Sequence, residues 1–289
     1  MSSTSRTNTP QNKNTHASAN ASRITTTPFQ RLILLTKTTQ FAWFVGHFTT
    51  FLSFIFYNLN GFPQFLYNLF YVGVLVSFGV QLYQCHFSTR RGAAGISNNI
   101  QGLISDVNFP YFIMAILWLL TPVNVIGCLP FFIFSLFHSL TYLKSILLPQ
   151  VFNPNLPIIS KINSFLVTNQ ERSMIYSANL ELACLFSVFF RALLWRPRSW
   201  IVLIAYILFI RTRYHGSIFM QDSIRHWVVR LDGVLSSPNV NIKIKMAYTR
   251  LKAYIERFDL LVSQYTRNLV KGNTSGSSDK DAAETKRQQ

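Results

Sequence analysis

The sequence predicts an all-α integral membrane protein built from helical hairpins, with four to six apolar segments followed by C-terminal amphipathic helices. Hydrophobic residues make up 49% of the 289 residues and charged residues only 13%, whereas a soluble domain carries about 25% charged residues. The apolar residues gather in blocks between Phe41 and Ile210, several of them close to the roughly 20 residues that a bilayer-spanning helix needs. The net charge of +17 favours an anionic partner, and the apolar blocks favour membrane lipid over nucleic acid.

The polar ends of the chain suggest four regions. Residues 1–40 are expected to be a disordered basic tail, because their first part is rich in Ser, Thr and Asn. This tail lacks the early apolar core of a cleavable signal peptide, so the first apolar segment is the expected targeting signal. Residues 41–211 form the predicted membrane domain, 212–271 the basic amphipathic helices, and 272–289 a disordered C-terminal tail.

Three pairs of apolar segments are expected to form the hairpins. The segments cover residues 41–59 and 65–85, 109–120 and 123–147, and 174–194 and 200–210. Short polar breaks join the members of each pair, namely Asn60-Gly61-Phe62-Pro63, Thr121-Pro122 and Arg196-Pro197-Arg198. The last segment would reach only about 16 Å as a helix, so it should dip into the bilayer rather than span it.

The distribution of basic residues predicts the orientation. The first two hairpin turns contain no Lys or Arg, whereas the N-terminal tail and the connections between hairpins do. Both termini are therefore expected to be cytosolic and the neutral turns lumenal, so the sequons at Asn20 and Asn273 should remain unglycosylated. The third turn breaks this pattern with Arg191, Arg196 and Arg198. Either it is lumenal against the rule, or the third pair is a shallow wedge on the cytosolic side, which is the favoured interpretation.

Beyond residue 211 the pattern becomes amphipathic. Apolar residues recur at helical spacing over residues 224–235 and again beyond Pro238, and residues 240–271 contain seven basic and two acidic side chains, a net of 7 − 2 = +5. Such helices are typical of an anionic membrane interface, although the apolar stripe could instead pack on the membrane domain. The predicted membrane-binding residues are Trp227, Leu231, Lys243, Lys245, Arg250, Leu251, Lys252, Ile255, Arg257 and Phe258.

One candidate polar site lies in the apolar segments, formed by His138, Asn179 and Glu181. An intramembrane carboxylate is a functional candidate because burying its charge is costly, and a transporter or channel using Glu181 is the alternative function. Glu181 could also be structural, paired with Asn179, Arg172 or Arg191. For His138 we expect an interhelical hydrogen bond.

Recognisable enzyme motifs are missing from the sequence. It contains no GxSxG, P-loop or GxGxxG motif, which argues against hydrolase, nucleotide-binding and dehydrogenase chemistry. The six histidines and three cysteines show no metal-binding spacing. We therefore predict no enzyme, no cofactor and no metal; a lipid-modifying enzyme would need catalytic groups that the sequence does not reveal.

Three stretches of the sequence resemble the transmembrane protein 33 family. They are LPFFIFSLFHSLTYLKSIL at 129–147, TNQERSMIYSANLELACLFSVFF at 168–190 and YILFIRTRY at 206–214, and the resemblance covers about residues 41–267. The fungal members of this family are tetra-spanning proteins and pore membrane proteins. The resemblance implies a non-enzymatic protein of the endoplasmic reticulum and nuclear envelope, including the nuclear pore. It also implies reticulon-type shaping proteins and nucleoporins as partners. Curved anionic lipids are expected as partners from the basic amphipathic helices, and nucleic acid is not expected because of the apolar blocks.

Overall fold

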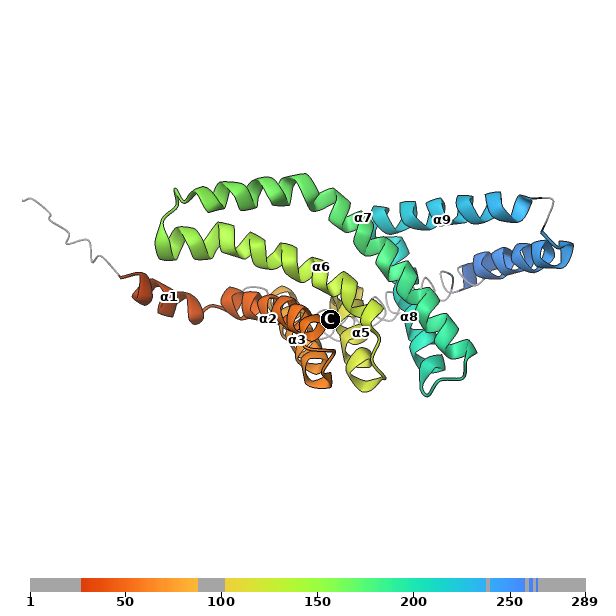
Figure 1. The fold of residues 1–289 in the computed structure, drawn as a ribbon, viewed down its shortest axis with the longest axis horizontal. Coiled ribbons are helices and arrows are strands. Elements are labelled where there is room, and N and C mark those ends of the chain that lie inside the picture. The colour runs from red at the N-terminus through yellow and green to blue at the C-terminus, as the bar shows by residue number, and fades with distance from the viewer. Residues whose placement is uncertain (1–26, 88–101, 238–239, 258–259, 262–263, 265–289) are drawn as a thin grey trace, which may run out of the picture.

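The computed structural model describes residues 27–87, 102–237, 240–257, 260–261 and 264, and all regular structure in these residues is helical (Figure 1). The all-α prediction is thereby confirmed. The elements are α1 (Pro28–Thr36), α2 (Thr39–Leu59), α3 (Gln64–His86), α5 (Asn108–Leu120), α6 (Val125–Tyr142), η2 (Leu143–Phe152), α7 (Pro157–Leu193), α8 (Ser199–Gly216) and α9 (Ile218–Ser236). Residues 242–257 are also helical.

The predicted hairpins are present as α2 with α3, α5 with α6, and α7 with α8. The first turn needs left-handed backbone at Gly61 (φ 73°) and Phe62 (φ 66°), a conformation that glycine adopts without steric cost. Within this hairpin the two helices cross at Gly46 and Gly73. A Cβ atom on Gly46 would lie 2.7 Å from the backbone nitrogen of Ser77, and one on Gly73 would lie 2.8 Å from the carbonyl oxygen of Gly46. Helices α2 and α3 can therefore pack this closely because these two positions have no side chains.

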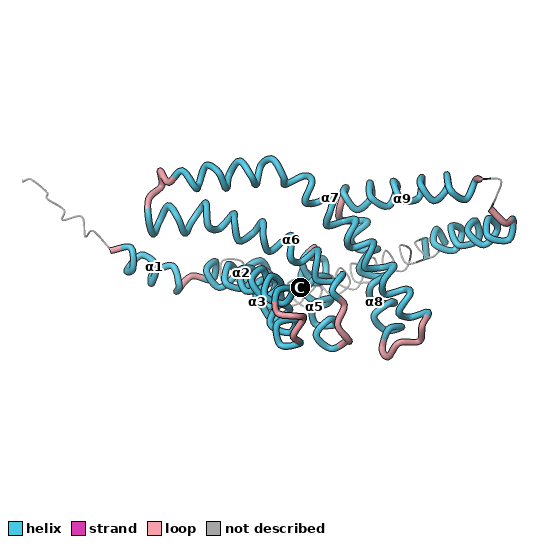
Figure 2. Tube along the Cα trace, viewed as in Figure 1, coloured by secondary structure: helices cyan, strands magenta, loops and turns pink. Residues whose placement is uncertain are grey.

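All three hairpin turns lie at the same edge of the molecule, the lower edge in Figure 1 and the pink loops there in Figure 2. The first half of α7 and α9 run sideways along the opposite edge. Between these edges α3, α5, α6, α7 and α8 contribute to one apolar core, in which Trp118, Tyr67, Tyr71 and Phe70 are among the largest fully buried side chains. The hairpins thus stand side by side, with long helices extending from their open ends.

Several helices extend beyond the predicted bounds. Residues 28–36 were expected to be part of a disordered tail, but they form α1, which begins with a capping box. Thr27 Oγ1 accepts from the Gln30 amide at 3.3 Å, and Gln30 Oε1 accepts from the Thr27 amide at 3.0 Å. The disordered-tail prediction is therefore wrong for these residues, whereas residues 1–26 and 272–289 lie outside the described chain. Helix α7 begins at Pro157, 17 residues before the predicted start at Met174, and α8 continues to Gly216.

Three of the described helices are long and apolar enough to cross a membrane: α3, α6 continued by η2 (Val125–Phe152), and α7. Helices α8 and α9 together would add a fourth span, broken by a 111° bend. Helix α5 is apolar but has only 13 residues. The membrane domain therefore combines full-length and short helices.

Candidate functional site

Glu181 lies at the centre of a buried polar cluster that joins three helices. Only 1% of the residue is exposed. The hydroxyl of Tyr111 on α5 donates to Glu181 Oε1 at 2.7 Å, and Nε of Arg213 on α8 donates to Oε2 at 3.1 Å. Each carboxylate oxygen therefore has a strong donor, as a buried charge requires.

Further contacts lock this cluster in place. The hydroxyl of Tyr206 donates to the carbonyl oxygen of Glu181 at 3.0 Å, and the guanidinium of Arg213 lies 5.1 Å from the ring centre of Tyr111. The adjoining cavity has a volume of about 10 Å³, which is enough for about one water molecule. The cluster accordingly has the properties of a structural ion pair. Its partners are Tyr111 and Arg213, not the predicted Arg172 or Arg191.

The other two residues of the predicted polar site lie elsewhere. Asn179 faces α9, where its Oδ1 accepts a hydrogen bond of 2.8 Å from Trp227 Nε1. His138 has ring contacts with Trp43 (5.1 Å) and His47 (4.7 Å) on α2. The prediction of one site formed by His138, Asn179 and Glu181 is therefore wrong.

A histidine of α2, His47, makes an interhelical hydrogen bond of the kind expected for His138. His47 is buried, and its Nδ1 lies 3.1 Å from Ser135 Oγ on α6. Sequence reasoning missed this residue. The available signal was its place within the first apolar segment, where a ring nitrogen needs a partner.

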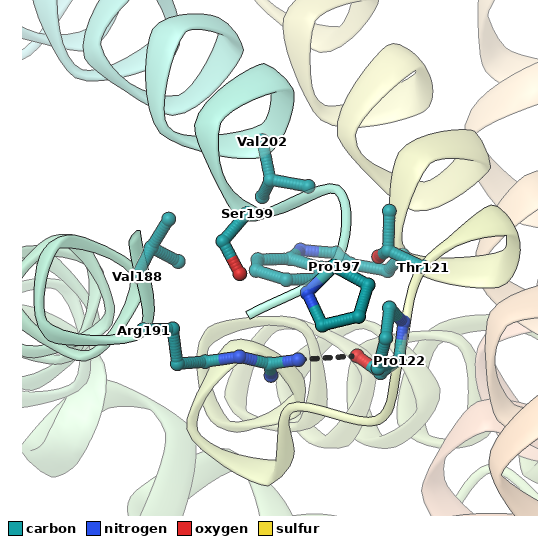
Figure 3. Close-up of a pocket in the computed structure, with 8 residues that line it drawn as sticks. Thr121, Pro122, Val188, Arg191, Pro197, Ser199 and Val202 are labelled. Carbon is teal, nitrogen blue, oxygen red and sulfur yellow. Dashed lines mark hydrogen bonds between the residues drawn. The ribbon is translucent and has the colours of Figure 1, made fainter. Parts of the chain in front are cut away.

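The arginines of the third turn bind the backbone of the second turn. Arg191 donates to the carbonyl oxygens of Val123 (2.9 Å) and Pro122 (3.4 Å), the latter drawn in Figure 3, and Arg198 donates to the carbonyl of Leu120 at 2.9 Å. Carbonyl groups at a helix C-terminus lack intrahelical partners, so the guanidinium of Arg198 caps the end of α5, while Arg191 binds the turn that follows it. The third turn therefore lies beside the second, which disfavours the predicted cytosolic wedge and supports the alternative, a third turn on the same side as the neutral turns.

The helix formed by residues 242–257 docks on α9 through one polar face. Lys252 Nζ lies 2.8 and 2.9 Å from the two carboxylate oxygens of Asp232, and Lys245 Nζ donates to the carbonyl of Ser236 at 3.4 Å. The hydrogen bond from Lys252 lowers the pKa of Asp232, and Asp232 in turn raises the pKa of Lys252. Because the pair is exposed to solvent, it orients the two helices more than it stabilises them.

The apolar face of this helix is left uncovered. Leu251 is 55% and Ile255 59% exposed, and Ile244 lies on the same face. Lys243, Arg250 and Arg257 follow one another at intervals of seven residues, so they form a basic row beside the apolar face. The alternative that this stripe packs on the membrane domain is not what the described residues show. Trp227 and Leu231 on α9 are partly exposed, and Phe258 lies outside the described residues.

Comparison with known proteins identifies the family. The profile described as Transmembrane protein 33/Nucleoporin POM33 matches residues 26–260. The chain belongs to this family. The Pore membrane protein of 33 kDa from Saccharomyces cerevisiae is 36% identical over 241 residues, which cover 79% of this chain and 86% of that protein. Tetra-spanning protein 1 from Schizosaccharomyces pombe is 29% identical over 245 residues, covering 79% of this chain and 87% of that protein.

A second yeast relative, Pore and endoplasmic reticulum protein of 33 kDa, is 30% identical over 231 residues, covering 69% of this chain and 83% of that protein. No solved structure matches the chain. Members of the transmembrane protein 33/nucleoporin POM33 family are non-enzymatic, multi-pass proteins of the pore membrane and endoplasmic reticulum. The predicted family and the predicted lack of enzymatic function are thereby confirmed.

Proposed function

We propose that this protein shapes or organises curved membrane in the endoplasmic reticulum and nuclear envelope and supports the assembly or distribution of nuclear pore complexes. The observation that carries this proposal is the uncovered apolar face of residues 242–257, with basic residues on either side of it. The names of its relatives, which refer to the pore membrane, a nucleoporin and the endoplasmic reticulum, support the location.

The geometry suggests how the C-terminal helix acts. Leu251 and Ile255 insert among the acyl chains just below the headgroups, while Lys243, Arg250 and Arg257 contact lipid phosphates. A helix inserted at this depth widens only one leaflet, and packing defects in a curved leaflet receive it most readily. Because the helix is tied to α9, and α9 to α7 through Trp227, this preference is transmitted to the membrane domain.

The orientation that we propose places both termini in the cytosol. The basic row then faces the leaflet rich in anionic lipids, and the hairpin turns point into the lumen. Reticulon-type shaping proteins and nucleoporins are the proposed protein partners, by family resemblance, at sites where this leaflet is strongly curved.

Sorting between flat and curved membrane tests the proposal. The full chain, labelled with a fluorophore, is reconstituted into giant vesicles containing anionic lipid, and its density is compared between the vesicle and a narrow tube pulled from it. The wild type is expected to be enriched in the tube, and the double variant Leu251→Asp, Ile255→Asp to lose this enrichment. Thr249→Asp with Ala253→Asp adds the same charge to the opposite side of the same helix, so it should sort like the wild type. Equal wild-type density in tube and vesicle would refute the curvature mechanism.

A further inference from the structure

One flank of the membrane domain is much shorter than a bilayer. We call it the short flank; it consists of α5, α8 and residues 181–193 of α7. Helix α5 has 13 residues, so it is about 20 Å long. Arg198, the residue before α8, and Arg213 on α8 are 213 − 198 = 15 residues apart, which corresponds to about 22 Å.

Both arginines are tied to the short flank at matching heights. Arg198 binds the carbonyl of Leu120, the last residue of α5. Arg213 binds Glu181, which also accepts from Tyr111 near the start of α5. Helices α5 and α8 are therefore antiparallel, and the apolar run of α8, residues 199–210, lies between Arg198 and Arg211.

The outer surface of this flank is apolar and has no protein partner among the described residues. Ile201 is 65%, Ile204 61% and Leu208 47% exposed, and their spacing of three and four residues places them on one side of α8. At the turn end Trp195 is 80% exposed and makes an edge contact with Trp200. Exposed tryptophans favour the headgroup region, and the apolar run of α8 stops at Arg211, whose charge avoids the bilayer centre, so each end of the flank belongs at a headgroup layer.

The opposite flank has ordinary dimensions. Helix α3 has 23 residues, or about 34 Å. Helix α6 and the first residue of η2 give 19 residues from Val125 before Lys144, or about 28 Å. The hydrocarbon core of a typical bilayer is about 30 Å thick. The two flanks of one membrane domain thus match bilayers of different thickness.

We infer that the short flank crosses the membrane and contacts a bilayer thinned locally to a hydrocarbon core of about 20 Å, with acyl chains covering Ile201, Ile204 and Leu208. The two ends of α8, fixed to α5 by Arg198 and to α7 by Arg213, draw the two headgroup layers together at this flank. The protein is therefore a membrane-thinning element on one side only. This inference is independent of lipid binding by residues 242–257.

Nitroxide depth measurements test the crossing. Single variants Ile201→Cys, Ile204→Cys and Leu208→Cys are labelled in the full chain carrying Cys85→Ser, since the remaining cysteines, Cys128 and Cys184, are buried. The Cys85→Ser chain without an introduced cysteine serves as the control for nonspecific labelling. Position 204 is expected to be deepest, with 201 and 208 shallower on either side. A depth that rises steadily from 208 to 201 would mean a wedge ending inside the bilayer, and equal depths would mean a helix lying in the interface; either result overturns the inference.

Bilayer thickness provides a second test, on the wild-type chain. The protein is reconstituted in phosphatidylcholine with monounsaturated chains of 14, 18 or 22 carbons, and its thermal unfolding is followed by circular dichroism. The unfolding midpoint is expected to be several degrees lower with 22 carbons than with 14 or 18, because the thickest bilayer matches neither flank. A midpoint that is highest at 22 carbons would overturn the inference.

Discussion

Arg213 on α8 and Glu181 on α7 form a buried ion pair of 3.1 Å, and Tyr111 on α5 completes it. A pair of this kind holds elements in register, because each charge is tolerated only while the other is present.

Removal of one charge should therefore cost more than removal of both. We expect Glu181→Leu to destabilise the protein by about 3–5 kcal/mol, because it leaves the guanidinium of Arg213 buried without a counter-charge. Adding Arg213→Met should recover a large part of this loss. Chemical unfolding in detergent measures both, with Asp232→Asn as an exposed control that changes little. If Glu181→Gln instead abolished a solute flux and left stability unchanged, the transporter hypothesis would replace the structural one.

The α2–α3 crossing should tolerate no side chain at Gly46. Alanine gains up to about 1 kcal/mol of helix propensity over glycine, but its Cβ would lie 2.7 Å from the backbone of Ser77. Because backbone cannot rotate away, we expect Gly46→Ala to lose about 1–3 kcal/mol overall. At Gly79 the nearest atom is 3.4 Å away, on the side chain of Phe112, so Gly79→Ala is the matched control. Equal unfolding midpoints for the two variants would contradict the close crossing.

Glycosylation mapping should place the three turns on one side. Acceptor sites introduced after Asn60 and after Arg196 are expected to be modified together, because Arg191 and Arg198 bind the second turn. Asn20 and Asn273 should remain unmodified. Modification after Asn60 but not after Arg196 would restore the cytosolic wedge, and a glycan on Asn20 would reverse the proposed orientation.

Asp106 should make stability depend on acid pH. Burial tends to raise its pKa, but hydrogen bonds of 2.8 Å from the Asn108 amide and with His86 outweigh this, so its pKa is lowered in the folded protein. A carboxylate with a depressed pKa stabilises the fold above its unfolded pKa of about 3.9, and this contribution is lost as pH falls through the lower folded value. Melting curves recorded between about pH 2 and 6 measure this effect. We expect the unfolding midpoint of Asp106→Asn to fall less than that of the wild type as the pH is lowered. Asp222 forms an exposed ion pair, so Asp222→Asn should show the same dependence of the unfolding midpoint on pH as the wild type.

The hairpins could be predicted because their signals are local. Apolar runs end at Asn60-Gly61 and Thr121-Pro122, and helix and turn propensities operate within a few residues. The first half of α7 was missed because its polar residues have no strong apolar period, and its helix is fixed by Pro157 at the first position and by continuity with the core half. The start of α1 could have been predicted from the capping box formed by Thr27 and Gln30.

Contacts between helices could not be predicted in the same way. Glu181 and Arg213 are 32 residues apart, and Glu181 and Tyr111 are 70 apart, so their pairing depends on how the hairpins rotate against one another. For the C-terminal helix, the sequence period identified the apolar face with Leu251 and Ile255. It did not show that Lys252 binds Asp232 on α9, because that contact depends on how the two helices pack.

The backbone carbonyls that accept from Arg191 and Arg198 precede these arginines by 68 and 78 residues. During synthesis the second hairpin therefore leaves the ribosome before the cations that cap it. Without the second hairpin, a nascent third hairpin would enter the membrane with two guanidinium groups that have no hydrogen-bond acceptors. When the second hairpin is already inserted, its backbone carbonyl groups are available as acceptors. The third hairpin thus docks on a partner that is synthesised before it.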